Sequence, residues 1–272
     1  MDKDAALVSL ATAVLAAWVA SGWTLIAILR RRWAGMPVVP ERPHRPVPWR
    51  GADVLATVGI MFVTRIVAEM LVGGQGDMNR QMLTGIVAMF GGAAVTAIVL
   101  RTGGATLRDF GLGPIHWSAD LRLAVAGLAL VIAPLLAVAA VLNTIVPYTH
   151  PIIDYLATHQ SPEAIGLVVV AAIVAAPITE EFLFRRVLQG WLEKLEPRLG
   201  AGSAIALTSL AFALAHAGHG LAWVPLLGLG AVLGVIVRHT GSIVPAVLLH
   251  ALFNAVSVGL LLVQLSGLIP AG

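Results

Sequence analysis

The 272-residue sequence contains no cysteine, few aromatic residues and few charges. Without cysteine the chain has no disulfide, no thiolate metal ligand and no cysteine nucleophile. Charged residues make up 11% of the chain, whereas ordinary soluble domains carry about 25%. This is too little polar surface for a water-facing globule of this size. The net charge of +3, with arginines dispersed between apolar blocks, also excludes a nucleic-acid-binding protein.

The remaining class is an all-α, polytopic membrane protein. Hydrophobic residues account for 58% of the chain, and the mean hydropathy is +0.91. A helix needs about 20 mostly apolar residues to cross a bilayer. The apolar runs show no period-2 alternation, which argues against barrel strands. About eight runs are predicted to be transmembrane helices: 5–29, 51–73, 82–100, 123–147, 164–184, 201–217, 222–237 and 243–265.

We predict that residues 1–272 form a single integral membrane domain, in which residues 1–150 provide N-terminal helices. Five prolines interrupt the stretch 33–49, which is therefore predicted to be an extended cytoplasmic linker. Trp33 and Trp49 at its ends are typical of interfacial anchors. Farther along the chain, a GxxxG pair of glycines at 230 and 234 favours close helix contact.

The distribution of basic residues predicts the orientation in the cell membrane. Fourteen of the 17 Lys and Arg residues lie on alternate loops, all on one side of the predicted helices. The loop 30–50 alone holds six arginines, whereas the loop 148–163 holds no Lys or Arg. Because basic loops stay in the cytoplasm, we expect both termini to lie outside.

Ionisable residues inside a predicted span mark a functional site by default. Arg65 and Glu69 are four residues apart on one helix face and are predicted to pair with each other. Glu181 and Arg185 have the same spacing and are predicted to hold local geometry. Glu180 is then the carboxylate without an intrahelical basic partner, which makes it the candidate general base.

Helix lengths predict where the other polar side chains lie. If the fifth run continues as a helix and turns near Arg198, Glu180 and His216 reach similar depths at ~1.5 Å per residue. His250 then lies about 10 Å below His216 along the helix axis. Asn254, one turn further along the same helix, lies about half as far below His216. Three helices can therefore bring these four side chains around one cavity.

A glutamate, two histidines and an asparagine are suited to amide hydrolysis. The glutamate deprotonates water, one histidine holds that water, and the other two side chains donate hydrogen bonds to an oxyanion. The same glutamate and histidines also form a zinc-ligand set with an open fourth position, although the helical H-E-x-x-H motif is absent. His219 is assigned to a solvated loop rather than to a ligand set. The simplest alternative is that each polar residue only forms an interhelical hydrogen bond, worth roughly 0.6 kcal/mol.

Three short motifs occur in order on successive predicted helices. They are Glu180-Glu181-x-x-x-Arg185, Phe212-x-x-x-His216 and His250-x-x-x-Asn254. Together they resemble the motifs of the CPBP family, which comprises type II CAAX prenyl endopeptidases and bacteriocin-processing intramembrane proteases and is also called the Abi family. The motifs cover roughly residues 165–260, and the first half of the chain shows only generic membrane helices.

The resemblance implies a helical membrane endopeptidase with a CPBP-like catalytic core at residues 160–265. Glu180, helped by His216, would activate water, and His250 and Asn254 would form the oxyanion site. The supporting residues would be Glu181, Arg185 and Phe212. The implied partners are the lipid bilayer and a membrane-associated protein or peptide substrate; the sequence does not predict the oligomeric state.

The resemblance leaves the metal dependence open between two versions of the protease. We favour the glutamate-type version without a cofactor. The alternatives are a zinc-dependent version with Glu180, His216 and His250 as ligands, and a non-catalytic immunity or scaffold protein of the same fold. Compared with prenyl-processing members, the chain ends soon after the third motif and carries an extra predicted helix at its start, which disfavours a prenylated substrate.

Overall fold

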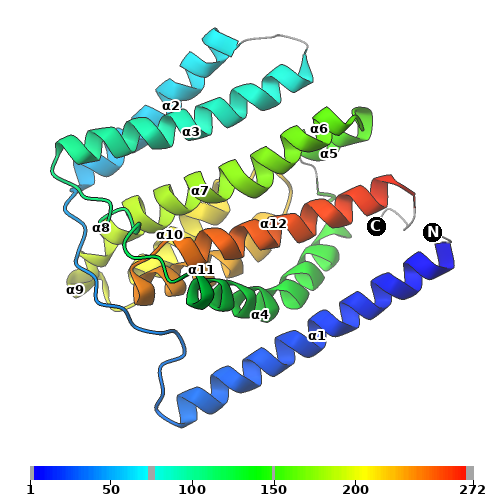
Figure 1. The fold of residues 1–272 in the computed structure, drawn as a ribbon, viewed down its shortest axis with the longest axis horizontal. Helices are drawn as coiled ribbons and strands as arrows, with labels where there is room; N and C mark the ends of the chain where they lie inside the picture. The colour runs from blue at the N-terminus through cyan, green and yellow to red at the C-terminus, as the bar shows by residue number, and fades with distance from the viewer. Residues whose placement is uncertain (1–2, 73–76, 149–150, 268–272) are drawn as a thin grey trace.

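The computed structural model describes residues 3–72, 77–148 and 151–267, and these residues form helices and connecting segments without a strand. The elements in chain order are α1 (Lys3–Trp33), α2 (Gly51–Val72), α3 (Met78–Thr102), α4 (Trp117–Asn143), α5 (Pro151–Thr158), α6 (Pro162–Val169), η1 (Val170–Ala175), α7 (Ala176–Glu180), η2 (Glu181–Gln189), α8 (Gly190–Glu193), α9 (Glu196–Leu199), α10 (Ser203–Leu214), α11 (Trp223–Thr240) and α12 (Val244–Leu265). The all-α prediction is confirmed (Figure 1).

Seven helical segments of the described chain are long and apolar enough to cross a membrane. They are Asp4–Trp33, Gly51–Val72, Met78–Thr102, Trp117–Asn143, Pro162–Glu193, Trp223–Thr240 and Val244–Leu265. The chain is therefore a multi-pass membrane protein. The predicted span 201–217 corresponds to α10, which has only 12 residues and at ~1.5 Å per residue is too short to cross the bilayer. Residue 73, the predicted end of the second run, lies outside the described residues.

The helix 162–193 contains two π-helical segments, η1 and η2. Pro177, near the start of α7, has no N–H to donate to the preceding turn. Glu180 is the last residue of α7 and lies directly between the two π segments. A π segment inserts an extra residue per turn and occurs frequently at functional sites. The helix thus changes its register on both sides of Glu180.

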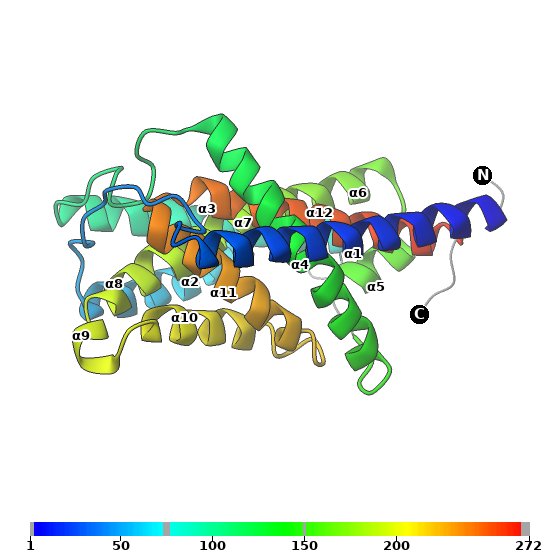
Figure 2. The ribbon, with the colours of Figure 1, turned by 90° about the horizontal axis from the view of Figure 1, so that it is seen from below.

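The hydrophobic core lies between α4, α11 and α12. Leu229 and Leu233 of α11 and Leu249 of α12 are fully buried there. Gly127 brings α4 close to α12, since a Cβ atom at this position would lie 2.8 Å from Leu249 Cδ2. In Figures 1 and 2, α12 lies between the long helix 162–193 and α4. This packing joins the N-terminal half of the chain to the helices that carry the three motifs.

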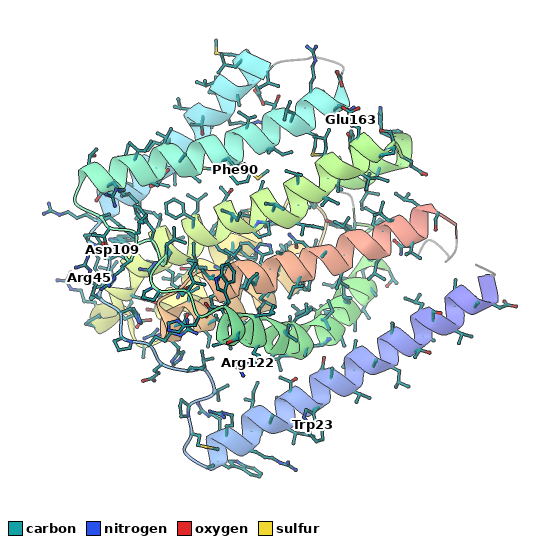
Figure 3. The ribbon with its side chains drawn as sticks, in the orientation of Figure 1. Trp23, Arg45, Phe90, Asp109, Arg122 and Glu163 are labelled. Carbon is teal, nitrogen blue, oxygen red and sulfur yellow. The ribbon has the colours of Figure 1, made fainter. Side chains whose placement is uncertain are left out.

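The outer helices pack less closely. The α2–α3 hairpin lies on the side of the long helix opposite α12 (Figure 1). Helix α1 packs against α4, where Ser21 Oγ donates a 2.6 Å hydrogen bond to the carbonyl of Ala129. Trp23 points away from the bundle (Figure 3). Arg65 Nε and Glu69 Oε1 lie 2.7 Å apart within α2, which confirms the predicted pair.

The proline-rich linker between α1 and α2 is not helical, as predicted. Trp33 at its start is 88% exposed, but Trp49 is not an interfacial anchor. Only 3% of Trp49 is exposed, and its Nε1 donates a 2.9 Å hydrogen bond to the Val187 carbonyl in η2. Lys194 Nζ also donates to the carbonyls of Val47 and Trp49. The linker is therefore fixed against the end of the long helix.

Two ion pairs hold the linker from the other side. Arg42 Nη2 lies 2.7 Å from Asp120 Oδ1, and Arg45 Nε lies 2.9 Å from Asp109 Oδ1 (Figure 3). Burial opposes ionisation of Asp109, but hydrogen bonds from Arg45 and Thr106 outweigh it and lower the pKa of Asp109 to about 2. Asp109 is therefore ionised, and the linker held, at any physiological pH.

Candidate active site

The Glu180 carboxylate lies between two imidazole rings. Its Oε1 is 3.9 Å from His216 Nε2, and its Oε2 is 3.9 Å from His250 Nε2. The Glu180 side chain is 22% exposed. Three segments far apart in the sequence therefore converge here, as predicted, but His250 lies as near to Glu180 as His216 does and not about 10 Å lower.

His216 lies just past the end of α10. Its Nδ1 is 2.9 Å from the Phe212 carbonyl oxygen. A carbonyl only accepts hydrogen bonds, so Nδ1 carries the proton, and in the neutral ring Nε2 is an acceptor that faces Glu180. The Phe212 ring lies 5.1 Å from the His216 ring and 5.7 Å from the His250 ring between centroids. Phe212 thus separates and orients the two imidazoles.

His250 is buried in α12, with its Nδ1 3.0 Å from Glu181 Oε1. An ionised carboxylate only accepts hydrogen bonds, so Nδ1–H donates to Glu181. Glu181 Oε2 also lies 3.2 Å from Arg185 Nε, and both of these side chains are 0% exposed. The Glu181–Arg185 pair is confirmed, but its contact with His250 was not predicted. Glu181 links the first motif to the third.

Asn254 lies one turn beyond His250 on α12, and its amide points to a different partner. Its Nδ2 donates a 2.8 Å hydrogen bond to the carbonyl of Ala172 in η1. A π segment displaces carbonyls from the regular helical ladder, and this bond satisfies one of them. Asn254 therefore connects α12 to the segment that precedes Glu180, while its second amide hydrogen is not used by this bond.

Two features near the site were not predicted from the sequence. The guanidinium carbon of Arg185 lies 4.8 Å from the centre of the Phe212 ring, and Gln189 is fully buried with its Nε2 3.0 Å from both Glu193 Oε1 and the Gly234 carbonyl. The four-residue spacing of Glu181, Arg185 and Gln189 could have identified this polar face. His219 lies in the turn after α10, and its N–H donates to the His216 carbonyl.

The three central groups are all acceptors when Glu180 is ionised and both rings are neutral. Acceptors do not attract one another, so their convergence calls for a donor between them. A water molecule or a shared proton supplies that donor. Within the described part of the chain, no three His, Asp or Glu residues are grouped closely enough to hold a metal ion.

Residues 162–256 match the family model of type II CAAX prenyl endopeptidase Rce1-like proteins. This segment, 95 of the 272 residues, is similar to the Rce1-like proteins. The matched segment starts at α6 and extends into α12, and it includes all three motifs. The match confirms the resemblance to the CAAX protease family and supports a protease function at a membrane. No curated protein and no solved structure matches the chain.

Proposed function

We propose that the protein is an intramembrane endopeptidase that hydrolyses a peptide bond of a membrane-associated protein or peptide. The observation that carries this proposal is the position of the Glu180 carboxylate between Nε2 of His216 and Nε2 of His250. The match to the Rce1-like model supports the same reaction class.

In the first step, Glu180 and His216 Nε2 accept the two hydrogens of one water molecule. Glu180 takes one proton as the water oxygen attacks the carbonyl carbon of the scissile bond. The pi electrons of the carbonyl move onto its oxygen, which becomes an oxyanion. A protonated His250, with Nδ1–H held by Glu181 and Nε2–H free to donate, stabilises this charge together with the second amide hydrogen of Asn254.

In the second step, the oxyanion re-forms the carbonyl and the carbon–nitrogen bond breaks. Glu180 returns its proton to the departing amine, so the general base of the first step becomes the general acid of the second. Glu181 keeps its negative charge beside Arg185 and holds His250 in the orientation that the oxyanion needs. The products are a carboxylic acid and an amine, and the enzyme is restored.

The first prediction concerns Glu180→Gln, which keeps the shape of the side chain but removes the base. We expect proteolysis to fall by ~100-fold or more, the usual contribution of a general base. The measurement compares membrane peptides from cells that produce the wild type or the variant. Glu163→Gln is the matched control, because Glu163 is exposed at the start of the same long helix (Figure 3).

Unchanged peptide profiles in Glu180→Gln and in His216→Ala, with both variants folded, would contradict the proposal and favour a non-catalytic membrane protein. Purified protein also tests the zinc-dependent version. Stoichiometric zinc that is lost in His250→Ala would replace the base mechanism with a metal mechanism. Full activity in a strong chelator would support Glu180 as the base that activates water.

We further propose that the basic end of the molecule faces the cytoplasm. The linker, α8 and α9 gather at one end in Figures 1 and 2, and this end carries the arginines of the 30–50 loop. Helix α10 leads away from this end and α11 returns to it (Figure 2), so the short α10 does not change the expected side of the termini. This supports both termini lying outside.

A further inference from the structure

Seven buried polar atoms around Glu180 have no hydrogen-bond partner within the described protein. They are Glu180 Oε2, Glu181 Oε2, the three side-chain nitrogens of Arg185, Gln189 Oε1 and Ser209 Oγ. Buried polar groups in folded proteins are nearly always hydrogen-bonded, to protein or to ordered water. A cluster of this size within one interface therefore needs a common explanation.

Arg185 has the largest number of unpaired hydrogen-bond donors among these residues. Its guanidinium carries five N–H donors, and the side chain is fully buried. Glu181 Oε2 is 3.2 Å from Nε but is not aligned as a hydrogen bond, because neither atom has such a partner. The nearby Phe212 ring attracts the positive charge but cannot accept all of these hydrogens. A cation buried in this way needs oxygen acceptors, and bound water provides them.

The unpaired atoms follow one face of the long helix. Glu181, Arg185, Gln189 and Glu193 succeed one another at four-residue spacing and so share a face. Gln189 Nε2 donates to Glu193 Oε1 and to the Gly234 carbonyl, while Gln189 Oε1 stays unpaired. Glu193 is only partly buried and ends α8. This polar face therefore runs from the candidate active site to the surface at the basic end.

The opposite wall is formed by the two glycines of the GxxxG pair. A Cβ atom at Gly234 would lie 2.9 Å from Gln189 Oε1. At Gly230 it would lie 3.2 Å from Ser209 Cβ and 3.3 Å from the Phe212 ring. The backbone of α11 therefore packs directly against the long helix and α10 at these two positions, and α11 offers no side-chain partner there to the unpaired polar atoms.

We propose that a file of ordered water molecules lies between η2 and the α10–α11 pair and connects Glu193 to Glu180. Its catalytic consequence rests on the proposed function: hydrolytic water reaches Glu180 through the protein rather than from the lipid side. Gln189 and Ser209 are positioning residues, because they hold this water rather than contact the substrate. The hydration itself does not depend on proteolysis.

The absence of cysteine from the chain allows a direct test of the water file. Single variants Ser209→Cys and Thr208→Cys place a thiol on neighbouring buried positions of α10. Thr208 is the matched control, because its hydroxyl is already satisfied by the Ala204 carbonyl at 2.7 Å. Hydrogen peroxide is close to water in size and oxidises a thiol that water can reach. Peptide mass spectrometry after quenching should show oxidation of Ser209→Cys roughly tenfold faster than of Thr208→Cys. Equal, slow oxidation of both would overturn the proposal.

A second experiment tests Gln189 as a positioning residue. Gln189→Met keeps the volume but removes the polar group. It should slow the peroxide reaction at Ser209→Cys and lower kcat roughly tenfold with KM unchanged, and Gln189→Glu should restore both. If Gln189→Met fails to fold, Gly234→Ala is the substitute, since its methyl group would displace Gln189 Oε1. A lowered kcat without any change in peroxide access would contradict the water file.

The two proposals fail in different ways. Selective oxidation of Ser209→Cys together with unchanged peptides in Glu180→Gln would support the water file and contradict the proteolytic function. Loss of proteolysis in Glu180→Gln with no selective oxidation would support the proteolytic function and contradict the water file.

Discussion

Glu181 makes shorter contacts at the site, at 3.0 and 3.2 Å, than the candidate base Glu180 beside it, at 3.9 Å. Its carboxylate accepts from His250 Nδ1 and lies against the Arg185 guanidinium, and all three side chains are buried. Removing one charge of a buried pair leaves the other uncompensated. Glu181 therefore has a structural role and also determines which His250 nitrogen carries the proton.

We predict that Glu181→Gln lowers the free energy of unfolding by about 3–5 kcal/mol, the usual cost of breaking a buried ion pair. The double variant Glu181→Leu/Arg185→Leu should unfold closer to the wild type than Glu181→Gln does, because no charge is left unpaired. Tryptophan fluorescence during thermal unfolding in detergent measures both. A double variant less stable than the single variant would show that the pair itself supplies net stability. Both variants should lose proteolysis, because His250 loses its partner.

At the scale of the element, the linker 34–50 is a fixed part of the molecule. Its attachment depends on two buried carboxylates, Asp120 in α4 and above all Asp109 outside the spans, which accepts hydrogen bonds from Arg45 and Thr106. The Asp109 backbone carbonyl also accepts two hydrogen bonds from Arg186 in η2. The linker and the long helix 162–193 are therefore joined through one residue.

We predict that Asp109→Asn loosens the linker, because a neutral amide cannot replace the ionised acceptor of Arg45. Hydrogen exchange of the amides at 36–50 should become faster. Glu41→Gln is the control on the same linker. Glu41 is 76% exposed, and its contact with His239 Nδ1 is long, at 3.6 Å, so its loss should not loosen the linker. Equal exchange in the two variants would contradict this role of Asp109.

The low pKa of Asp109 also sets a pH dependence. The folded value of about 2 lies below the ordinary 3.8, so the stabilisation is fully present above about pH 4. It is lost as the pH falls through the folded pKa near 2. The rate of hydrogen exchange at the amides of the wild-type linker, corrected for the intrinsic effect of pH on exchange, should stay constant between about pH 5 and 8. A transition within this window would contradict the assignment.

At the scale of the whole molecule, the contact between α4 and α12 joins α4, and the α1 helix packed on it, to the segment that matches the Rce1-like model. Gly127 permits this contact, and the nearest atom to its missing side chain belongs to the fully buried Leu249. Close-packed interiors tolerate added volume poorly. The stability of the helices that carry the three motifs therefore depends on a glycine outside the matched segment.

We predict that Gly127→Leu lowers the free energy of unfolding by about 1–3 kcal/mol, the usual cost of overpacking a core. Gly59→Leu is the matched control, because a Cβ atom at Gly59 in α2 meets nothing within 4 Å. Thermal unfolding in detergent compares the two. Equal stability of the two variants would show that α4 and α12 separate without cost.

The membrane class, the helical fold and the ion pairs within one helix follow from the sequence alone. Arg65 with Glu69 and Glu181 with Arg185 were predictable because four residues make about one turn, so the partners are local. Helix lengths also predicted that Glu180 and His216 meet, but they placed His250 about 10 Å lower, whereas the structure brings it equally close to Glu180.

How these helices face one another depends on their packing in the folded protein. It paired His250 with Glu181, directed Asn254 to the Ala172 carbonyl and buried Trp49 against η2. Each contact joins residues at least 69 positions apart, and neither spacing nor composition encodes the rotation of a helix about its axis. The two π segments change that rotation on both sides of Glu180, which is why the partners of the polar residues in these helices follow only from packing.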